Sequence, residues 1–145
     1  MAYQYILIPV AVVLITQIIK LSIDKIKGNL NLKNVFLSYG GMPSAHTAFS
    51  VSVATLIGMT QGFRSPLFAV ALGFTLIVMR DAVTFRNILG QQGKLLNQFI
   101  STMPLREQKS MPHFLERIGH SFSEVVIGAG WGAVSTYVLY NLFNR

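Results

Sequence analysis

Four long apolar segments constrain the fold of this chain more than any other feature of its sequence. They cover residues 5–21, 46–62, 66–85 and 122–143. A helix that crosses a bilayer needs about 20 mostly apolar residues, with a lower limit near 17. Three segments meet this length, whereas 46–62 is marginal and rich in serine and threonine, which favours a place inside a bundle. We therefore predict an all-α fold, a polytopic membrane bundle of about four transmembrane helices.

The composition excludes several other classes of protein. Only 12% of the residues are charged and 52% are hydrophobic, whereas soluble domains carry roughly 25% charged residues. A net charge of +7 would suggest nucleic acid as the partner of a soluble protein. Here the basic residues lie between apolar runs, so we expect membrane lipids and no nucleic acid. The absence of cysteine excludes disulfides, thiol nucleophiles and cysteine-ligated metals.

The distribution of basic residues predicts the orientation in the membrane. Ten of the twelve lysines and arginines lie in two stretches, about 20–43 and 80–121, and only Arg64 and Arg145 lie elsewhere. Because cytoplasmic loops carry the excess of basic residues, we expect these stretches on the cytoplasmic or stromal face of an inner membrane, plasma or organellar. The N-terminus would then lie outside. A further helix over 86–103 is expected at the membrane interface.

A small-residue pattern marks the fourth segment. Gly128 and Gly132 form a G-x-x-x-G, which lets helices approach closely. This contact could form within one chain or between two chains as a homodimer, and the sequence leaves both open.

The turn before the second segment is the first candidate for chemistry. It reads Gly40-Gly41-Met42-Pro43-Ser44-Ala45-His46-Thr47. A helix that begins here presents free N–H groups and a positive dipole end, which suit a phosphate. A serine hydroxyl and an imidazole add a donor and a proton carrier. The alternative interpretation is structural, with Ser44 as a helix cap and His46 at the headgroup level.

The start of the fourth segment carries a histidine and a carboxylate at helical spacing. His120 and Glu124 are four residues apart and share a helix face. A carboxylate there can hold one imidazole nitrogen and leave the other as a nucleophile. The alternative is an interfacial histidine with a glutamate that favours the helix dipole. A carboxylate inside an apolar run is costly without a partner, which makes Glu124 a functional candidate.

The remaining charged candidates end the first and third segments. Lys20 ends the first segment, while Asp81 and Arg86 follow the third. In the predicted topology these residues lie on the same side as both histidines. Phosphoryl transfer through a phosphohistidine needs such a set, because cations neutralise the phosphate oxygens while one histidine attacks and another protonates the leaving oxygen.

The run from Gly41 to His46 resembles the Pro-Ser-Gly-His motif of the type 2 phosphatidic acid phosphatases and vanadium haloperoxidases. It is more similar still to their divergent branch of small membrane proteins, with Gly-Gly-Met-Pro-Ser-Ser-His-Ser. The similarity continues through Asp81-Ala82, Arg86 and the run from Gly119 to Ala129. The resemblance therefore covers nearly the whole chain and implies one integral-membrane, phosphatase-like domain over residues 1–145.

The resemblance also implies roles for individual residues. It implies that His120 is the nucleophile and that His46 is the general acid. Glu124 stands in place of the family's aspartate, which orients the nucleophile. It implies phosphate-binding residues: Lys20, Ser44, the Ala45 amide and Arg86. It leaves accessory positions at Asp81, Lys27 and Gly41. The chain departs from the family where Ala45 replaces a glycine and where Phe114 stands at the usual arginine position, so that Arg86 comes from elsewhere.

Together these features predict a lipid-phosphate monoesterase that uses neither metal nor cofactor. Its substrate would be a lipid with a terminal phosphate. Phosphatidylglycerophosphate fits a cytoplasmic site best because it is made there, and phosphatidate or a polyprenyl phosphate or diphosphate are alternatives. The competing hypothesis is a non-catalytic scaffold or assembly factor that binds anionic lipid. The two hypotheses differ in whether His46, Arg86 and His120 converge on one phosphate.

Overall fold

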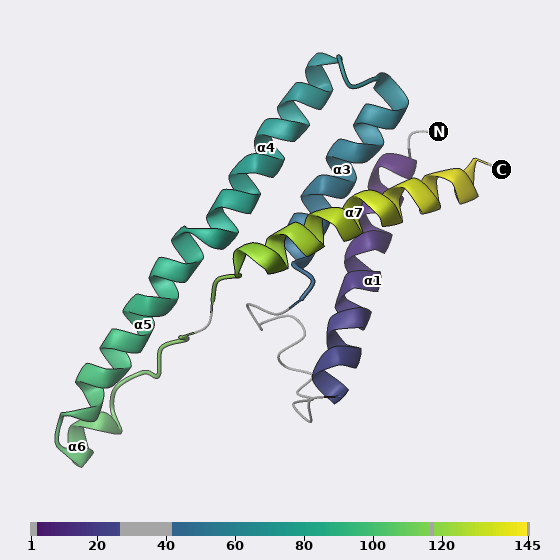
Figure 1. The fold of residues 1–145 in the computed structure, drawn as a ribbon. Helices are drawn as coiled ribbons and strands as arrows, with labels where there is room; N and C mark the ends of the chain where they lie inside the picture. Colours follow the sequence, from purple (N-terminus) through teal and green to yellow (C-terminus); the bar gives the residue numbers. More distant parts are fainter. Residues whose placement is uncertain (1–2, 27–41, 117, 145) are drawn as a thin grey trace.

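The computed structural model describes residues 3–26, 42–116 and 118–144, and all regular structure in these ranges is helical. Figure 1 shows the helices packed as a bundle, with the last helices before α7, at residues 85–108, projecting from it. The helices are α1 (Gln4–Ile26), α3 (Ala45–Gln61), α4 (Pro66–Val83), α5 (Phe85–Ser101), α6 (Leu105–Gln108) and α7 (Phe122–Phe143). The predicted all-α membrane bundle is confirmed.

Three stretches of the described chain are long and apolar enough to cross a bilayer. They are Gln4–Ile23, Pro66–Ser101 and Phe122–Phe143, whereas the sequence predicted about four spans. The difference lies in α3, which has 17 residues and packs against α1, α4 and α7. Its polar side chains, among them Thr47, Ser50 and Ser52, are buried. The prediction that this segment lies inside the bundle is therefore confirmed.

The two glycines of the G-x-x-x-G pattern bring α7 against α3. A Cβ at Gly128 would lie 2.8 Å from the Ser44 carbonyl oxygen, and one at Gly132 would lie 2.5 Å from that of Ala48. Both distances are too short for a side chain, so the close approach requires glycine. One turn further along, the hydroxyls of Thr136 and Ser52 are hydrogen-bonded at 2.6 Å. The pattern thus joins two helices of one chain, because Gly128 and Gly132 of α7 lie against the start of α3 at Ser44 and Ala48.

The helices α4 and α5 follow nearly the same line, with Thr84 between them. Figure 1 shows that α5 extends past the other helices and that the chain returns from α6 towards α7. The predicted helix over 86–103 is therefore present as α5. It continues the line of α4, from which only Thr84 separates it. Asn97 holds the returning chain, since its amide donates to the Phe114 carbonyl at 2.8 Å and accepts from the Phe114 N–H at 3.0 Å.

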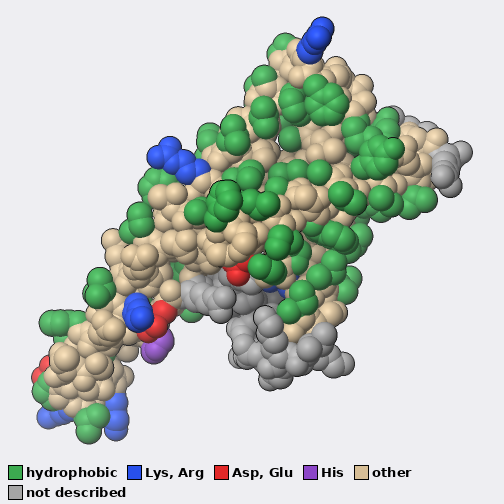
Figure 2. Space-filling view, viewed as in Figure 1, with side chains coloured by type: hydrophobic (Ala, Val, Ile, Leu, Met, Phe, Trp, Pro, Cys, Tyr) green, Lys and Arg blue, Asp and Glu red, His purple; other side chains and the backbone are tan. Residues whose placement is uncertain are grey.

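Apolar side chains cover much of the outer surface. Val70 and Ile77 on α4 are each 68% exposed, and other large apolar side chains of α1 and α7 are similarly placed. Figure 2 shows hydrophobic side chains spread over the visible face, with few charged groups outside the α5–α6 end. An exposed apolar surface of this extent is unfavourable in water but compatible with lipid. The buried interior, by contrast, holds many hydroxyl groups.

Candidate active site

One pocket gathers the main candidates from four parts of the chain. It has a volume of about 230 Å³, and its lining includes His46 from α3, Asp81 from α4, Arg86 from α5 and His120, which precedes α7. The other described residues in its lining are Ile77, Val78 and Ala82. Both histidines and the arginine thus line one cavity, an arrangement that the enzyme hypothesis requires.

His120 is held tightly in this pocket by its backbone, while its ring has no partner. Its side chain is only 4% exposed, and its N–H donates to the Ala82 carbonyl at 3.1 Å. Within the described part of the chain, neither imidazole nitrogen has a hydrogen-bond partner. Buried polar atoms are nearly always hydrogen-bonded in folded proteins. This exception lies in a cavity large enough for a ligand that would supply the partner.

The surroundings of His120 favour the neutral form of its imidazole. Burial lowers the pKa of His120 most, and the positive charges of Lys20, His46 and Arg86 lower it further, against the opposing effect of Glu124. The pKa of His120 therefore lies below its ordinary value. A neutral imidazole keeps the lone pair that a nucleophile requires. Lys20, buried on α1, thus acts electrostatically on this site from a fourth helix.

The side chain of Glu124 has a different hydrogen-bond partner from the one that the sequence predicted. Its Oε2 accepts a hydrogen bond from the Ser121 N–H at 2.9 Å, and its own N–H donates to the Ser121 hydroxyl at 3.3 Å. These two bonds form a capping box at the start of α7, which satisfies two exposed backbone donors. The predicted hydrogen bond from the His120 ring to Glu124 is therefore absent. Glu124 influences His120 through its charge.

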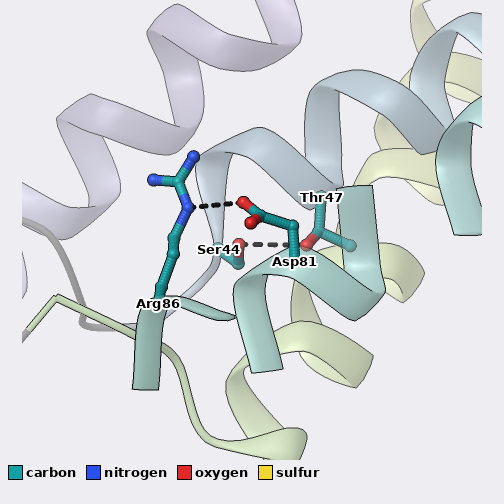
Figure 3. A network of polar contacts seen from close by, with 4 residues as sticks. All are labelled: Ser44, Thr47, Asp81 and Arg86. Atoms are coloured by element: carbon teal, nitrogen blue, oxygen red, sulfur yellow. Dashed lines mark hydrogen bonds and ion pairs between the residues drawn. The ribbon is translucent and has the colours of Figure 1, made fainter. Parts of the chain in front are cut away.

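Arg86 is fixed in the pocket by an ion pair. Its Nε donates to Asp81 Oδ2 at 2.7 Å, as Figure 3 shows. The two residues stand on either side of the junction between α4 and α5, so the pair bridges that junction. Arg86 lies 34 residues before His120 in the sequence, yet both line the same cavity. The guanidinium is thus placed to neutralise a bound anion.

The predicted phosphate cradle at the start of α3 is not part of the pocket lining. Ser44 is fully buried, its N–H donates to the Glu124 carbonyl at 3.3 Å, and its hydroxyl accepts from Thr47 Oγ1 at 3.0 Å (Figure 3). Ser44 is the N-cap residue of α3 but makes no side-chain capping bond. Ala45 is also buried.

Two accessory predictions cannot be placed in this site. Lys27 and Gly41 lie outside the described residues.

Comparisons with known proteins show the family of this chain. The profile of the Divergent PAP2 family matches residues 1–135. The chain belongs to this family. One relative of this PAP2-related protein is a membrane protein of Bacillus subtilis (strain 168), named "Uncharacterized membrane protein YuiD". The two are 31% identical over 144 residues, which cover 92% of this chain and 91% of the relative. No solved structure matches the chain.

Sequence reasoning missed one residue in this divergent PAP2 protein that contacts the site. Asn87 donates from its amide to the His120 carbonyl at 3.0 Å and to the Val83 carbonyl at 2.8 Å. The one feature of the sequence that could have indicated Asn87 is its position directly after Arg86, which lines the pocket. Nothing in the local pattern indicates that its partner lies 33 residues away.

Proposed function

We propose that this protein is a membrane lipid-phosphate phosphatase that works through a phosphohistidine. The observation that carries the proposal is the pocket that His46, Arg86 and His120 share, in which the buried His120 ring has both nitrogens without a partner in the described chain. Membership of a PAP2-related family supports the same class of reaction.

The chemistry follows from the positions of these side chains. A neutral His120 nitrogen attacks phosphorus and forms an N–P bond, while the P–O bond to the lipid alcohol breaks. His46 protonates the departing alkoxide. Arg86, with the nearby positive charge of Lys20, offsets the negative charge of the phosphate oxygens as it grows. Water then attacks the phosphohistidine with His46 as the base, which releases inorganic phosphate and restores both histidines.

The pocket also supports a lipid as the substrate. Its apolar side is formed by Ile77 and Val78 of α4, and Ile77 is exposed on the lipid-facing surface. A terminal phosphate would bind between the histidines and the arginine while the chains stay in the apolar phase. On the predicted cytoplasmic or stromal face we propose phosphatidylglycerophosphate first, with phosphatidate and polyprenyl phosphates or diphosphates as alternatives.

A phosphate-release assay on purified protein in detergent tests the proposal. The panel holds phosphatidylglycerophosphate, phosphatidate and a polyprenyl phosphate and diphosphate, each compared between wild type and His120→Ala. We expect release from at least one lipid by the wild type alone. If no lipid phosphate is hydrolysed while the protein still binds anionic vesicles, the non-catalytic scaffold replaces the enzyme.

Inhibition provides a separate prediction about the charges in the site. Vanadate should inhibit because it adopts the five-coordinate geometry of phosphoryl transfer. EDTA should leave activity unchanged, because Arg86 and Lys20 supply the positive charge. Both are measured in the same phosphate-release assay. Loss of activity in EDTA that magnesium restores would contradict the assignment and make Asp81 a metal ligand.

The orientation in the membrane gives a prediction that needs no activity. The native chain has no cysteine, so a single introduced cysteine reports its own side of the membrane. In intact cells, an impermeant thiol reagent should label Arg64→Cys and spare Lys109→Cys, because the basic stretches face the cytoplasm. Labelling of Lys109→Cys alone would place the site on the opposite face.

A further inference from the structure

The nucleophile and the phosphate-binding arginine come from different elements, so their separation depends on contacts and not on chain connectivity. Between Arg86 and His120 the chain runs out along α5, turns at α6 and returns. The return segment packs against α5 at Gly90 and Gly93, where an added Cβ would meet the Glu116 and Leu115 carbonyl oxygens. Catalysis by both groups also requires that His120, which follows this segment, is held near the pocket, on the α4–α5 side.

The backbone of His120 is hydrogen-bonded to that side at both of its polar atoms. Its N–H donates to the Ala82 carbonyl at 3.1 Å, and its carbonyl accepts from Asn87 Nδ2 at 3.0 Å. The same Nδ2 donates to the Val83 carbonyl at 2.8 Å. The two N–H bonds of one amide thus join the His120 backbone to the last turn of α4.

The packing around Asn87 shows how close this contact is. A Cβ at position 119 would overlap the Oδ1 and Cγ atoms of Asn87. Only glycine lets the chain before His120 lie against the asparagine side chain. Gly119 and Asn87 are therefore matched to one another, although neither lines the pocket.

We propose that Asn87 is a positioning residue that holds His120 in register with Arg86, its neighbour in sequence. This inference rests on the proposed function, because it concerns the distance between the nucleophile and the anion-binding group. Asn87 does not line the pocket and acts through the His120 backbone. A nucleophile displaced by about 1 Å can lose roughly 10²-fold in rate, so a loosened backbone at His120 should slow attack on phosphorus.

The test compares Asn87→Asp with a matched variant on the same helix, Asn97→Asp. The aspartate is isosteric but has no amide donors, so it loses both bonds at position 87. The Asn97 amide likewise donates to a backbone carbonyl, that of Phe114, and also to Glu116 Oε1 at 2.8 Å. Asn97 lies farther along α5, outside the pocket lining, and serves as the control. Asn87→Ala removes the same bonds without a new charge and decides the question if the aspartate variant aggregates on gel filtration.

The first measurement is independent of activity. Diethyl pyrocarbonate modifies accessible neutral imidazoles, and mass spectrometry reports each histidine separately. The buried His120 should react about tenfold faster in Asn87→Asp, as expected when the hydrogen bonds that hold a segment are lost. His113, which is exposed and does not line the pocket, is the internal reference, and Asn97→Asp should match the wild type. Unchanged reactivity of His120 in both Asn87 variants would overturn the proposal.

The second measurement is a single turnover with a labelled lipid phosphate. Its amplitude counts folded enzyme, whereas its rate constant reports the geometry of attack. In Asn87→Asp the rate constant should fall about 10²-fold at unchanged amplitude, and in Asn97→Asp it should fall less than threefold. Loss of amplitude at an unchanged rate constant would reduce Asn87 to a folding role. A wild type that never forms phosphoenzyme would overturn the proposed function instead, whatever the result with diethyl pyrocarbonate.

Discussion

Replacement of His120 by alanine should abolish phosphoenzyme formation and phosphate release together. The imidazole is the nucleophile in the proposed mechanism, so its loss prevents the first chemical step and does not merely slow it. Loss of a catalytic nucleophile lowers kcat by about 10⁴-fold or more in well-studied hydrolases. The measurement is phosphate release from the best lipid of the panel, with phosphoenzyme trapped in parallel.

A third histidine provides the control for this variant. His113 is exposed on the segment that returns from α6 and does not line the pocket. His113→Ala should therefore keep activity within about twofold of the wild type, as is usual for exposed positions away from a site. Wild-type turnover in His120→Ala would show that the mechanism does not use this histidine.

The effect of replacing His46 should depend on the leaving group of the substrate. A lipid alkoxide is a poor leaving group and needs a proton, so His46→Ala should lower turnover of a lipid phosphate by about 10²–10⁴-fold. An aryl phosphate leaves as a stable phenolate, and on it the same variant should lose less than about tenfold. Both rates are measured on one preparation, which cancels differences in the folded fraction.

The ratio of the two losses is the informative quantity. Equal losses on lipid and aryl phosphates would mean that His46 binds phosphate or supports the fold and donates no proton. Complete loss in His46→Ala combined with full activity in His120→Ala would reverse the assignment of acid and nucleophile.

The helical membrane fold could be predicted from the sequence because its signals are local. Length and apolarity define α1, α4 and α7, and the serine and threonine content of the second segment indicates its buried place. The continuity of α4 and α5 could not be predicted, because Arg80, Asp81 and Arg86 resemble the end of a span. The G-x-x-x-G pattern predicted close helix packing. It did not predict which helix packs against α7, because that depends on the three-dimensional path of α3.

Some of the residues that line the pocket were predicted from the sequence, but their hydrogen bonds were not, and the predicted phosphate cradle at Ser44 and Ala45 is not in the lining. His46, Arg86 and His120 were identified from chemistry, spacing and resemblance, and they line one pocket. Helical spacing suggested that Glu124 holds His120, but a helix start offers backbone donors that compete for the same carboxylate, and Ser121 wins that competition. Asn87 was missed because its contact with His120 joins distant parts of the chain.

The central claim is a covalent phosphohistidine on His120, and it is tested most directly by trapping it. Enzyme mixed with labelled lipid phosphate is quenched in alkali, where the N–P bond of phosphohistidine survives, and the modified peptide is sequenced by mass spectrometry. The mechanism predicts one phosphate on His120 in the wild type and none in His120→Ala. Phosphate on His46, or turnover without any phosphorylated histidine, would contradict it.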